Sequence, residues 1–423
     1  MKIDRGLLGT LAVAALGAAC ASAGGTGGTG PGGGPRTTVQ LPAVTCSTGR
    51  LAAAPAADSA AGKLALMATV ADSARPQAYT AARAQAGRAI AADPGNAYGY
   101  YLAGQAAIGL ANYADADSLL RRSEELCPEL GDYDVTRLRR GSAQLSVERG
   151  SSLVQSGDTT GGLAAYQTAL SLDPTSYPAE FYLGLVAFHR QNTEEAVRRW
   201  QHVISIIDAL PADSAADVML GRTETRANTL NALVLASAQY LTRQQSAPAA
   251  ALLGELTRLL PNSPDAWYNY ALALNNLQRY TELVPVAQRA TEVAPLSYGA
   301  WILYYNAYAG QSQAATTAGN TAQAGELGRQ ARQISARSEG LPVQLESISI
   351  DVEGDNTNIR GTAVGAGPTA PVQVEFTLYG AAGELGKGTV TITPPAREQQ
   401  SRWELTIPNS APVLGITYRV VGS

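Results

Sequence analysis

Residues 264–295 read PDAWYNYALALNNLQRYTELVPVAQRATEVAP, which is the pattern of two short helices joined by a polar turn. Apolar and small residues recur at helical intervals of three and four, first in Trp267-x2-Tyr270-Ala271-x2-Leu274 and then in Leu283-x3-Ala287-x2-Ala290. One such pair of helices cannot bury its own apolar face, so it has to stack against similar pairs. This stretch therefore predicts a helical repeat protein.

The same pattern recurs upstream and downstream, and a proline closes most of the copies. These prolines stand at positions 94, 128, 174, 211, 261 and 295, at intervals of 34, 46, 37, 50 and 34 residues. The clearest further copies are Tyr100-x2-Ala103-Gly104, Leu183-Gly184-x2-Ala187, Leu233-x2-Ala236-Ser237 and Trp301-x2-Tyr304. An interval of 34 with small residues in phase resembles the tetratricopeptide repeat, a helix-turn-helix unit.

That resemblance implies a mainly α fold, a solenoid of about six or seven irregular repeats over residues 60–340. The residues expected to pack the repeats together are Gly104, Ala116, Gly184, Ala196, Trp267, Ala271 and Trp301. The two long intervals, 46 and 50 residues, predict longer helices or loops. The polar stretch 311–323 is expected to interrupt the last repeat.

In this family the first helix of each unit lines a concave groove that holds a protein or peptide partner. Carried onto this sequence, the groove positions are Tyr101, Phe181, Phe188, Tyr268 and Ile302. The alternative is that these side chains pack between repeats. Chaperone-binding members of the family grip a terminal carboxylate with lysines, but this chain has no lysine from 64 to 386. A partner with apolar side chains is therefore expected.

Residues 1–23 have the features of a bacterial signal peptide, a short basic start followed by an apolar stretch too short to span a bilayer. The segment Leu16-Gly17-Ala18-Ala19-Cys20 resembles a lipobox, which implies lipidation of Cys20. Ordinary cleavage after Ala23 is the alternative. Residues 24–59 are rich in Gly, Pro and Ala and predict a flexible tether. The expected location is the cell envelope, anchored by lipid and facing the periplasm.

Two further cysteines, Cys46 and Cys127, complete the set of three. An oxidising compartment permits a disulfide between them, which would pin the N-terminal segment to the first repeats. The alternative is two unrelated cysteines, with Cys127 packed as a small apolar residue. The chain has no CxxC pair, so neither a thiol-redox site nor a structural zinc site is predicted.

Beyond Leu341 the composition changes to alternating β-branched residues with Gly and Pro turns. Six strand-like runs within residues 341–423 predict a small antiparallel β-sandwich. The run Phe376-Thr377-Leu378-Tyr379-Gly380 resembles the FxLYD immunoglobulin-like family, although that family usually has aspartate where Gly380 stands. Two roles stay open for this domain, a second adhesion or docking module or a cap over the apolar face of the last repeat.

The sequence contains few of the residues and motifs that enzymes use for catalysis. His189 and His202 are the only histidines, and their spacing matches no zinc motif. There is no nucleophile elbow with a downstream histidine and no phosphate-binding loop. The net charge of −4 argues against nucleic acid as a partner, and residues 137–140, with three arginines, are interpreted as a solvated cluster. No enzyme, cofactor or metal is expected.

The leading functional hypothesis is a non-catalytic protein-interaction scaffold of the bacterial cell envelope. The alternative is an assembly or piloting factor of an outer-membrane machine, such as an insertion complex or a secretin. An enzyme with a carbohydrate-binding sandwich is a third hypothesis, which the scarcity of histidine disfavours.

Overall fold

The computed structural model describes Cys46 and residues 55–67, 70–131, 135–211, 216–366, 370–397 and 399–421. The expected signal peptide, its acceptor Cys20 and most of the expected tether therefore lie outside the described residues. Within them, no helix is both long enough and apolar enough to cross a membrane.

The helical part begins at Pro55 and ends at Glu339. Its first half contains α1 (Pro55–Ala65), the 3-10 helix η3 (Asp72–Ala74), α2 (Arg75–Ala92), α3 (Ala97–Gly109), α4 (Tyr113–Leu126), α5 (Pro128–Leu130), α6 (Thr136–Gln155) and α7 (Thr159–Leu172). Its second half contains α8 (Tyr177–His189), α9 (Thr193–Ala209), α10 (Ala216–Thr242), α11 (Ser246–Leu259), α12 (Pro264–Asn276), α13 (Tyr280–Val293), α14 (Tyr298–Thr317) and α15 (Thr321–Glu339). The fold is mainly α, as predicted.

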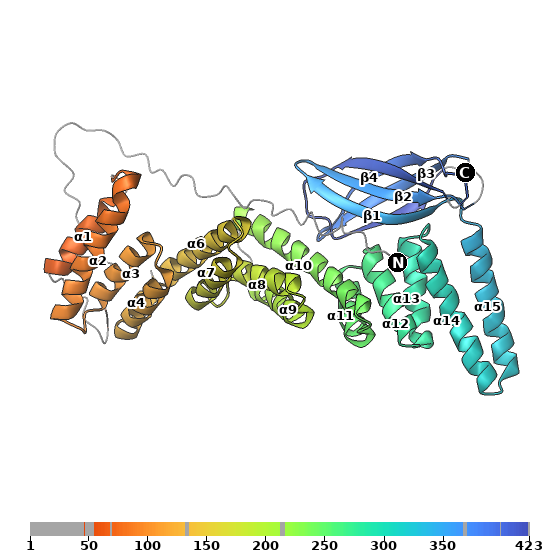
Figure 1. Cartoon of the computed structure of the whole chain (residues 1–423), viewed down its shortest axis with the longest axis horizontal. Helices are drawn as coiled ribbons and strands as arrows, with labels where there is room; N and C mark the ends of the chain where they lie inside the picture. Colours follow the sequence, from red (N-terminus) through yellow and green to blue (C-terminus); the bar gives the residue numbers. More distant parts are fainter. Residues whose placement is uncertain are drawn as a thin grey trace.

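The helices form antiparallel pairs that stack side by side into an elongated solenoid (Figure 1). Two details differ from the sequence prediction. Residues 55–59, assigned to the tether, belong to α1 because the alanine-rich segment packs against α2 and α3. The polar stretch 311–323 does not interrupt a repeat, since α14 continues to Thr317 with these polar side chains mostly exposed.

Within the pairs, a recurring turn joins the first helix to the second. A residue with positive φ precedes the second helix in six of the pairs, at Ala111, Gly157, Gln191, Gln244, Gln278 and Gly319. In four of these, the next residue caps the second helix, and its side-chain oxygen accepts a hydrogen bond from a backbone N–H of the first turn, as Asn192 does from Glu195. The turn therefore reverses the chain within three residues.

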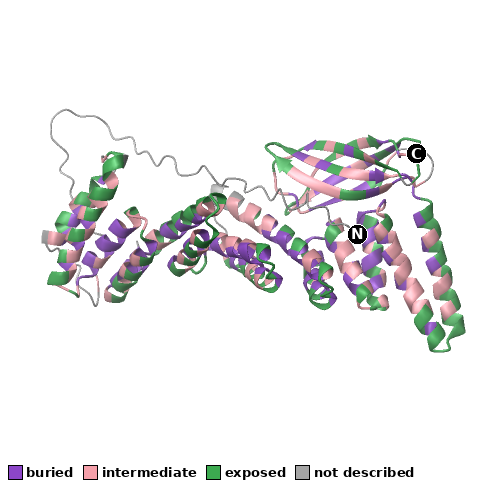
Figure 2. Ribbon diagram, viewed as in Figure 1, coloured by how far each residue is buried: buried purple, intermediate pink, exposed green. Residues whose placement is uncertain are grey.

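Small residues bring the two helices of a pair into close contact. An added Cβ at Gly184 would lie 2.4 Å from Trp200 Nε1, and one at Gly104 would lie 2.7 Å from a Leu120 methyl carbon. In both pairs the large partner follows the glycine by 16 residues. The three alanines expected to pack the repeats, Ala116, Ala196 and Ala271, are fully buried. Buried residues accordingly follow the contacts between helices along the whole stack (Figure 2).

The C-terminal part is a sandwich of two three-stranded antiparallel sheets. One sheet has the order β1-β2-β5, with β1 (Gln344–Glu353), β2 (Asn356–Val364) and β5 (Gln400–Pro408); the other has the order β4-β3-β6, with β4 (Gly383–Ile392), β3 (Val372–Gly380) and β6 (Gly415–Val420). Phe376 occupies the centre, with its ring centroid 5.0 Å from that of Trp403 and 5.2 Å from that of Tyr418. The antiparallel sandwich confirms the predicted fold class.

The sandwich packs against one edge of the solenoid, over α12 and α13 (Figure 1). Val293 at the end of α13 and Leu296 in the loop before α14 share an apolar cluster with the sandwich core. An added Cβ at Gly415 would lie 2.3 Å from the Asn262 carbonyl oxygen, so β6 touches the α11–α12 loop directly. The domain therefore caps apolar repeat surface, at an edge of the stack instead of on its last helix.

Candidate partner-binding surface

The first helices of the C-terminal pairs form the inner side of the stack. Contacts join α8 to α10, α10 to α12 and α12 to α14. Within the described residues, no contacts of that extent join α9 to α11, α11 to α13 or α13 to α15. A stack bends toward the side on which its helices lie closer together, so α8, α10, α12 and α14 line the concave side.

The bend has the opposite sense between α4 and α7. There the second helices, α4 and α7, contact each other, and α4 also contacts α6. First helices also contact at the N-terminal end, where α1 meets α3, but the longest uninterrupted run of such contacts extends from α8 to α14. A partner segment that follows this surface would cross four successive helices.

Partly exposed apolar side chains form a row on these inner helices. The row consists of Phe181 and Leu185 on α8, Leu241 on α10, Tyr268 and Leu272 on α12, and Ile302 on α14. All except Ile302 pack against the central apolar cluster of the solenoid while keeping part of their surface accessible. We call these six residues the inner row.

Three of the five expected groove residues, Phe181, Tyr268 and Ile302, belong to the inner row. The other two do not line a groove, which corrects the prediction for them. Phe188 is buried, with its ring centroid 5.6 Å from that of Trp200. Tyr101 is buried in a separate N-terminal cluster, where its ring stacks on that of Tyr98. Phe188 and Tyr101 therefore pack between helices, which is the alternative considered for the groove candidates.

Tyr268 lies where the inner row meets the sandwich. An added Cβ at Gly299 would lie 3.0 Å from its ring, so the phenol rests against the start of α14. Burial raises the pKa of the Tyr268 hydroxyl, and the negative charge of Glu346 on β1 raises it further. The sandwich therefore stands close to one end of the inner row, and Tyr268 is neutral at physiological pH.

Trp267 and Trp301, expected to pack the repeats, are partly buried and lie against the sandwich. The Trp267 indole N–H donates to the Pro261 carbonyl at 3.0 Å, and that of Trp301 donates to the Pro295 carbonyl at 2.8 Å. Each ring thus ties the start of its helix to the loop before it. These tryptophans join the two domains as well as neighbouring repeats.

Charge is distributed unequally between the inner and outer helices. Residues 227–242 of α10, 266–276 of α12 and 298–317 of α14 contain no Asp, Glu, Lys, Arg or His. The outer helices α9, α13 and α15 carry several charged residues each, among them Glu195 with Arg199 and Arg289 with Glu292. This contrast was available in the sequence, but it becomes meaningful only once the inner helices are known.

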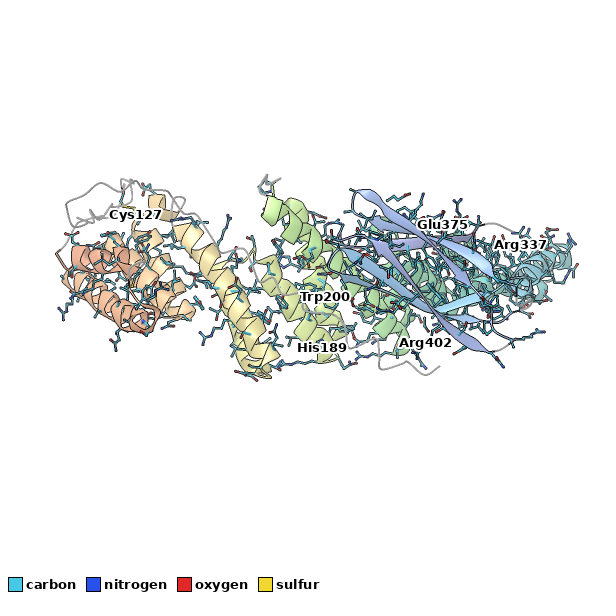
Figure 3. The ribbon with its side chains drawn as sticks, turned by 90° about the horizontal axis from the view of Figure 1, so that it is seen from above. Cys127, His189, Trp200, Arg337, Glu375 and Arg402 are labelled. Atoms are coloured by element: carbon cyan, nitrogen blue, oxygen red, sulfur yellow. A yellow bond between two sulfur atoms is a disulfide. The ribbon has the colours of Figure 1, made fainter. Side chains whose placement is uncertain are left out.

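The charged group of α8 is held within its own pair of helices. Glu180 on α8 is buried and accepts from Arg199 Nη1 at 2.7 Å, while His202 Nδ1 lies 3.1 Å from its other oxygen. His189 is exposed at the end of α8, on the pair that also contains Trp200 (Figure 3). The two histidines thus lie apart and do not form a shared site.

Arg139 corrects the interpretation of residues 137–140 as a solvated cluster. Its Nη2 lies 2.9 Å from Asp117 Oδ1 and donates to the Ser171 carbonyl at 3.1 Å. Arg121 donates to the same carbonyl at 2.7 Å. These bonds connect α4, α6 and the end of α7, where the stack changes its bend. Nothing in the local sequence distinguishes Arg139 from its neighbours.

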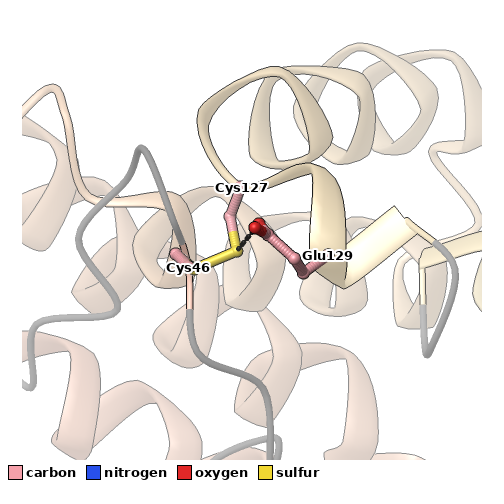
Figure 4. Close-up of side chains that lie close together, drawn as sticks. All are labelled: Cys46, Cys127 and Glu129. Atoms are coloured by element: carbon pink, nitrogen blue, oxygen red, sulfur yellow. Dashed lines mark hydrogen bonds between the residues drawn. A yellow bond between two sulfur atoms is a disulfide. The ribbon is translucent and has the colours of Figure 1, made fainter.

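Cys46 and Cys127 are joined by a disulfide, with a sequence separation of 81 and a Cα–Cα distance of 5.2 Å. Together with Glu129 they are the only group of three His, Cys, Asp or Glu residues, among those described, whose ligand atoms could surround one metal ion (Figure 4). Both sulfurs are bonded to each other and are therefore not thiolate ligands.

A family model of the tetratricopeptide repeat matches residues 147–203 and 239–298. The matched segments include α8 and α12 of the inner row, the end of α10 with Leu241, and only the first residue of α14. No curated protein matches the chain.

Three solved structures illustrate this likeness. YrrB, described as a TPR protein with an unusual peptide-binding site, is 17% identical, with 49% of this chain and 90% of YrrB covered and a TM-score of 0.28. MamA is 14% identical, with 48% and 98% covered and a TM-score of 0.31. The C-terminal part of a TPR protein from Cytophaga hutchinsonii is 13% identical, with 66% and 95% covered and a TM-score of 0.26.

Proposed function

We propose that the chain is a non-catalytic scaffold of the bacterial cell envelope that binds a partner protein along the inner row. The tetratricopeptide fold supports a protein–protein interaction scaffold. The observation that carries the proposal is the inner row itself, six partly exposed apolar side chains on four adjacent helices. A monomeric surface rarely keeps such a continuous apolar strip unless it binds something.

The chemistry of this surface favours an uncharged, apolar partner segment. Charged side chains are missing from long stretches of α10, α12 and α14, so they offer no partner for an acidic or basic peptide. Exposed Asn276 and half-buried Asn306 stand beside the row and supply amide groups. Aromatic anchors with a few amides suit an amphipathic helix or an extended segment.

We also propose an immunoglobulin-like topology for the sandwich. Its sheet orders β1-β2-β5 and β4-β3-β6 match strands A-B-E and C′-C-F of that fold. The chain then enters the sandwich by strand A directly after α15. This proposal describes architecture, and it assigns the domain no ligand.

The envelope location rests on the N-terminal sequence, which lies outside the described residues. We propose that Cys20 is lipidated and that the scaffold faces the periplasm. The experiment is detergent phase partitioning of the wild type and of Cys20→Ser. The wild type should enter the detergent phase and the variant the aqueous phase; a wild-type protein that stays in the aqueous phase would contradict the lipid anchor.

The binding surface is tested by site-specific photo-crosslinking in the cells that produce the protein. A crosslinking amino acid at Leu272, in the inner row, should yield one dominant adduct. The same probe at Gln288, exposed on the outer helix α13, should not yield it. Adducts of equal pattern and intensity at both positions would contradict the assignment of the surface.

A second variant tests whether the adduct reports binding in the row. Tyr268→Ala should weaken the crosslink at Leu272 while circular dichroism keeps the helical signal of the wild type. Arg289→Ala serves as the matched outer control, because Arg289 lies on the outer helix α13, where it contacts Glu292 and the α11–α12 loop. An adduct that survives Tyr268→Ala unchanged would remove this residue from the surface.

A further inference from the structure

The disulfide joins two sulfurs in different environments (Figure 4). Cys127 is fully buried among alanine and leucine side chains of α1–α4, whereas Cys46 is half-buried at the border of the same cluster. A reductant can therefore approach Cys46 Sγ, while Cys127 Sγ is shielded. When the bond is cleaved by attack at Cys46, Cys127 has to leave as the thiolate.

Three features of the structure disfavour that thiolate. Burial in an apolar cluster disfavours any charged sulfur. Cys127 directly follows the last residue of α4, whose C-terminal end carries the negative end of the helix dipole. A carboxylate oxygen of Glu129 lies 3.7 Å from Cys127 Sγ. All three act in the same direction, since each raises the free energy of negative charge on this sulfur.

We propose that Cys46–Cys127 is a reduction-resistant staple in which Glu129 acts on Cys127 to make it a poor leaving group. In the first step a reagent thiolate bonds to Cys46 Sγ, and the Cys46–Cys127 bond breaks with its electron pair on Cys127, which then takes a proton from water. In the second step the other thiol of the reagent displaces Cys46. The reagent is oxidised by two electrons to its own disulfide, and the protein disulfide is reduced.

Resistance to reduction has a structural consequence. The staple connects the chain at Cys46 to the junction between α4 and α5, so it closes a covalent loop that contains α1, α2, α3 and α4. Force applied at Cys46 is transmitted to the end of α4 without passing through α1 and α2. A tethered protein would keep its first repeats folded under such a load only while the bond stays closed.

The test is the rate of reduction by dithiothreitol at pH 8, followed by alkylation of free thiols and mass spectrometry of the full chain. Glu129→Gln should be reduced roughly threefold faster than the wild type, because a thiolate that is less disfavoured leaves faster. Glu125→Gln is the matched control, because Glu125 is equally distant from Cys127 in sequence, is exposed and pairs with Arg122.

Equal rates for the wild type and both variants would overturn the proposal, and so would equal acceleration by both substitutions. A second measurement separates the charge effect from loosened structure. With a neutral phosphine as reductant, the ratio of the Glu129→Gln rate to the wild-type rate should fall toward one as the pH is lowered, because protonation removes the charge that distinguishes glutamate from glutamine. A ratio independent of pH would overturn the role of the carboxylate.

Discussion

The two ends of the solenoid are stabilised by different means. At the N-terminal end, the apolar cluster contains 14 buried residues, and seven of them are alanine. At the C-terminal end, the cluster shared by the last repeats and the sandwich contains 18, and only Ala294 and Ala363 are alanine. The N-terminal end has a disulfide, while the C-terminal end has a docked domain.

Buried area explains why the ends differ. A buried Val, Leu, Ile or Phe side chain contributes about 1.5–3 kcal/mol, whereas one methylene-sized group contributes about 0.8 kcal/mol. An alanine core packs helices closely but removes little apolar surface from water. The N-terminal end compensates by a covalent link that restricts its unfolded chain. The C-terminal end needs no such link, because β3, β5 and β6 supply large side chains to one shared core.

Loss of the disulfide should change the difference in stability between the two ends more than any other change considered below. Cys46→Ser should destabilise the N-terminal repeats by about 2–5 kcal/mol, since the bond closes a long loop. All four tryptophans lie at or beyond position 200, so tryptophan fluorescence reports only the C-terminal part. In denaturant, circular dichroism should show an early transition that fluorescence does not show. An early transition in both signals would mean that the N-terminal end does not unfold separately.

A change in the middle of the stack tests how far the two ends are coupled. In Gly184→Leu, the added side chain collides with the buried Trp200 ring, and overpacking should cost about 1–3 kcal/mol. Because each repeat contacts only its neighbours, the ends should then unfold in separate steps. Differential scanning calorimetry should show two transitions, and a single unshifted transition would contradict the packing role of Gly184.

The C-terminal end should be sensitive to a single methyl group at the domain contact. Gly415→Ala places a Cβ against the Asn262 carbonyl, which is backbone and cannot move aside cheaply. The sandwich should loosen from α12 and α13 at a cost of about 1–3 kcal/mol. Fluorescence of Trp267 and Trp301 should change at a lower denaturant concentration than in the wild type. The unfolding transition of the N-terminal repeats should stay unchanged. Unchanged fluorescence would place the domain contact elsewhere.

The smallest effects come from helical glycines that face open space. No atom lies within 4 Å of an added Cβ at Gly62 in α1 or at Gly325 in α15. Alanine at either site should stabilise its end by about 0.5–1 kcal/mol, because it reduces the freedom of the unfolded chain. Thermal melts of the two variants would show how much the same substitution changes the stability of each end. Destabilisation at Gly62 would reveal crowding at the N-terminal end.

Much of the fold could be predicted from the sequence because it depends on local spacing. Ala271 and Gly184 are small residues in phase with large apolar ones, and periodicity alone identifies such positions. The six strands follow from period-two alternation, as in Val374, Phe376 and Leu378. The predicted interruption at 311–323 was wrong, because α14 continues to Thr317, packs against α15 through Ala315 and leaves most of its polar side chains exposed on the other side.

The candidate surface was predicted only in part. Phe181 and Tyr268 share one repeat position with Tyr101, yet Tyr101 is buried and the other two are partly exposed. The difference arises because the stack reverses its bend between α4 and α7, which depends on contacts among α4, α6 and α7. Arg139 was missed for the same reason, since Asp117 and Ser171 come from other helices.

The sequence by itself determined the helix pairs, their closing prolines and the change to strands after Leu341, since each follows from residues close together in the chain. Tertiary structure decided which apolar side chains remain accessible, which edge the sandwich covers, and that Cys46 meets Cys127. These outcomes depend on groups far apart in sequence, such as Gly415 against Asn262 or Tyr268 near Glu346. Only the folded chain brings them within contact distance.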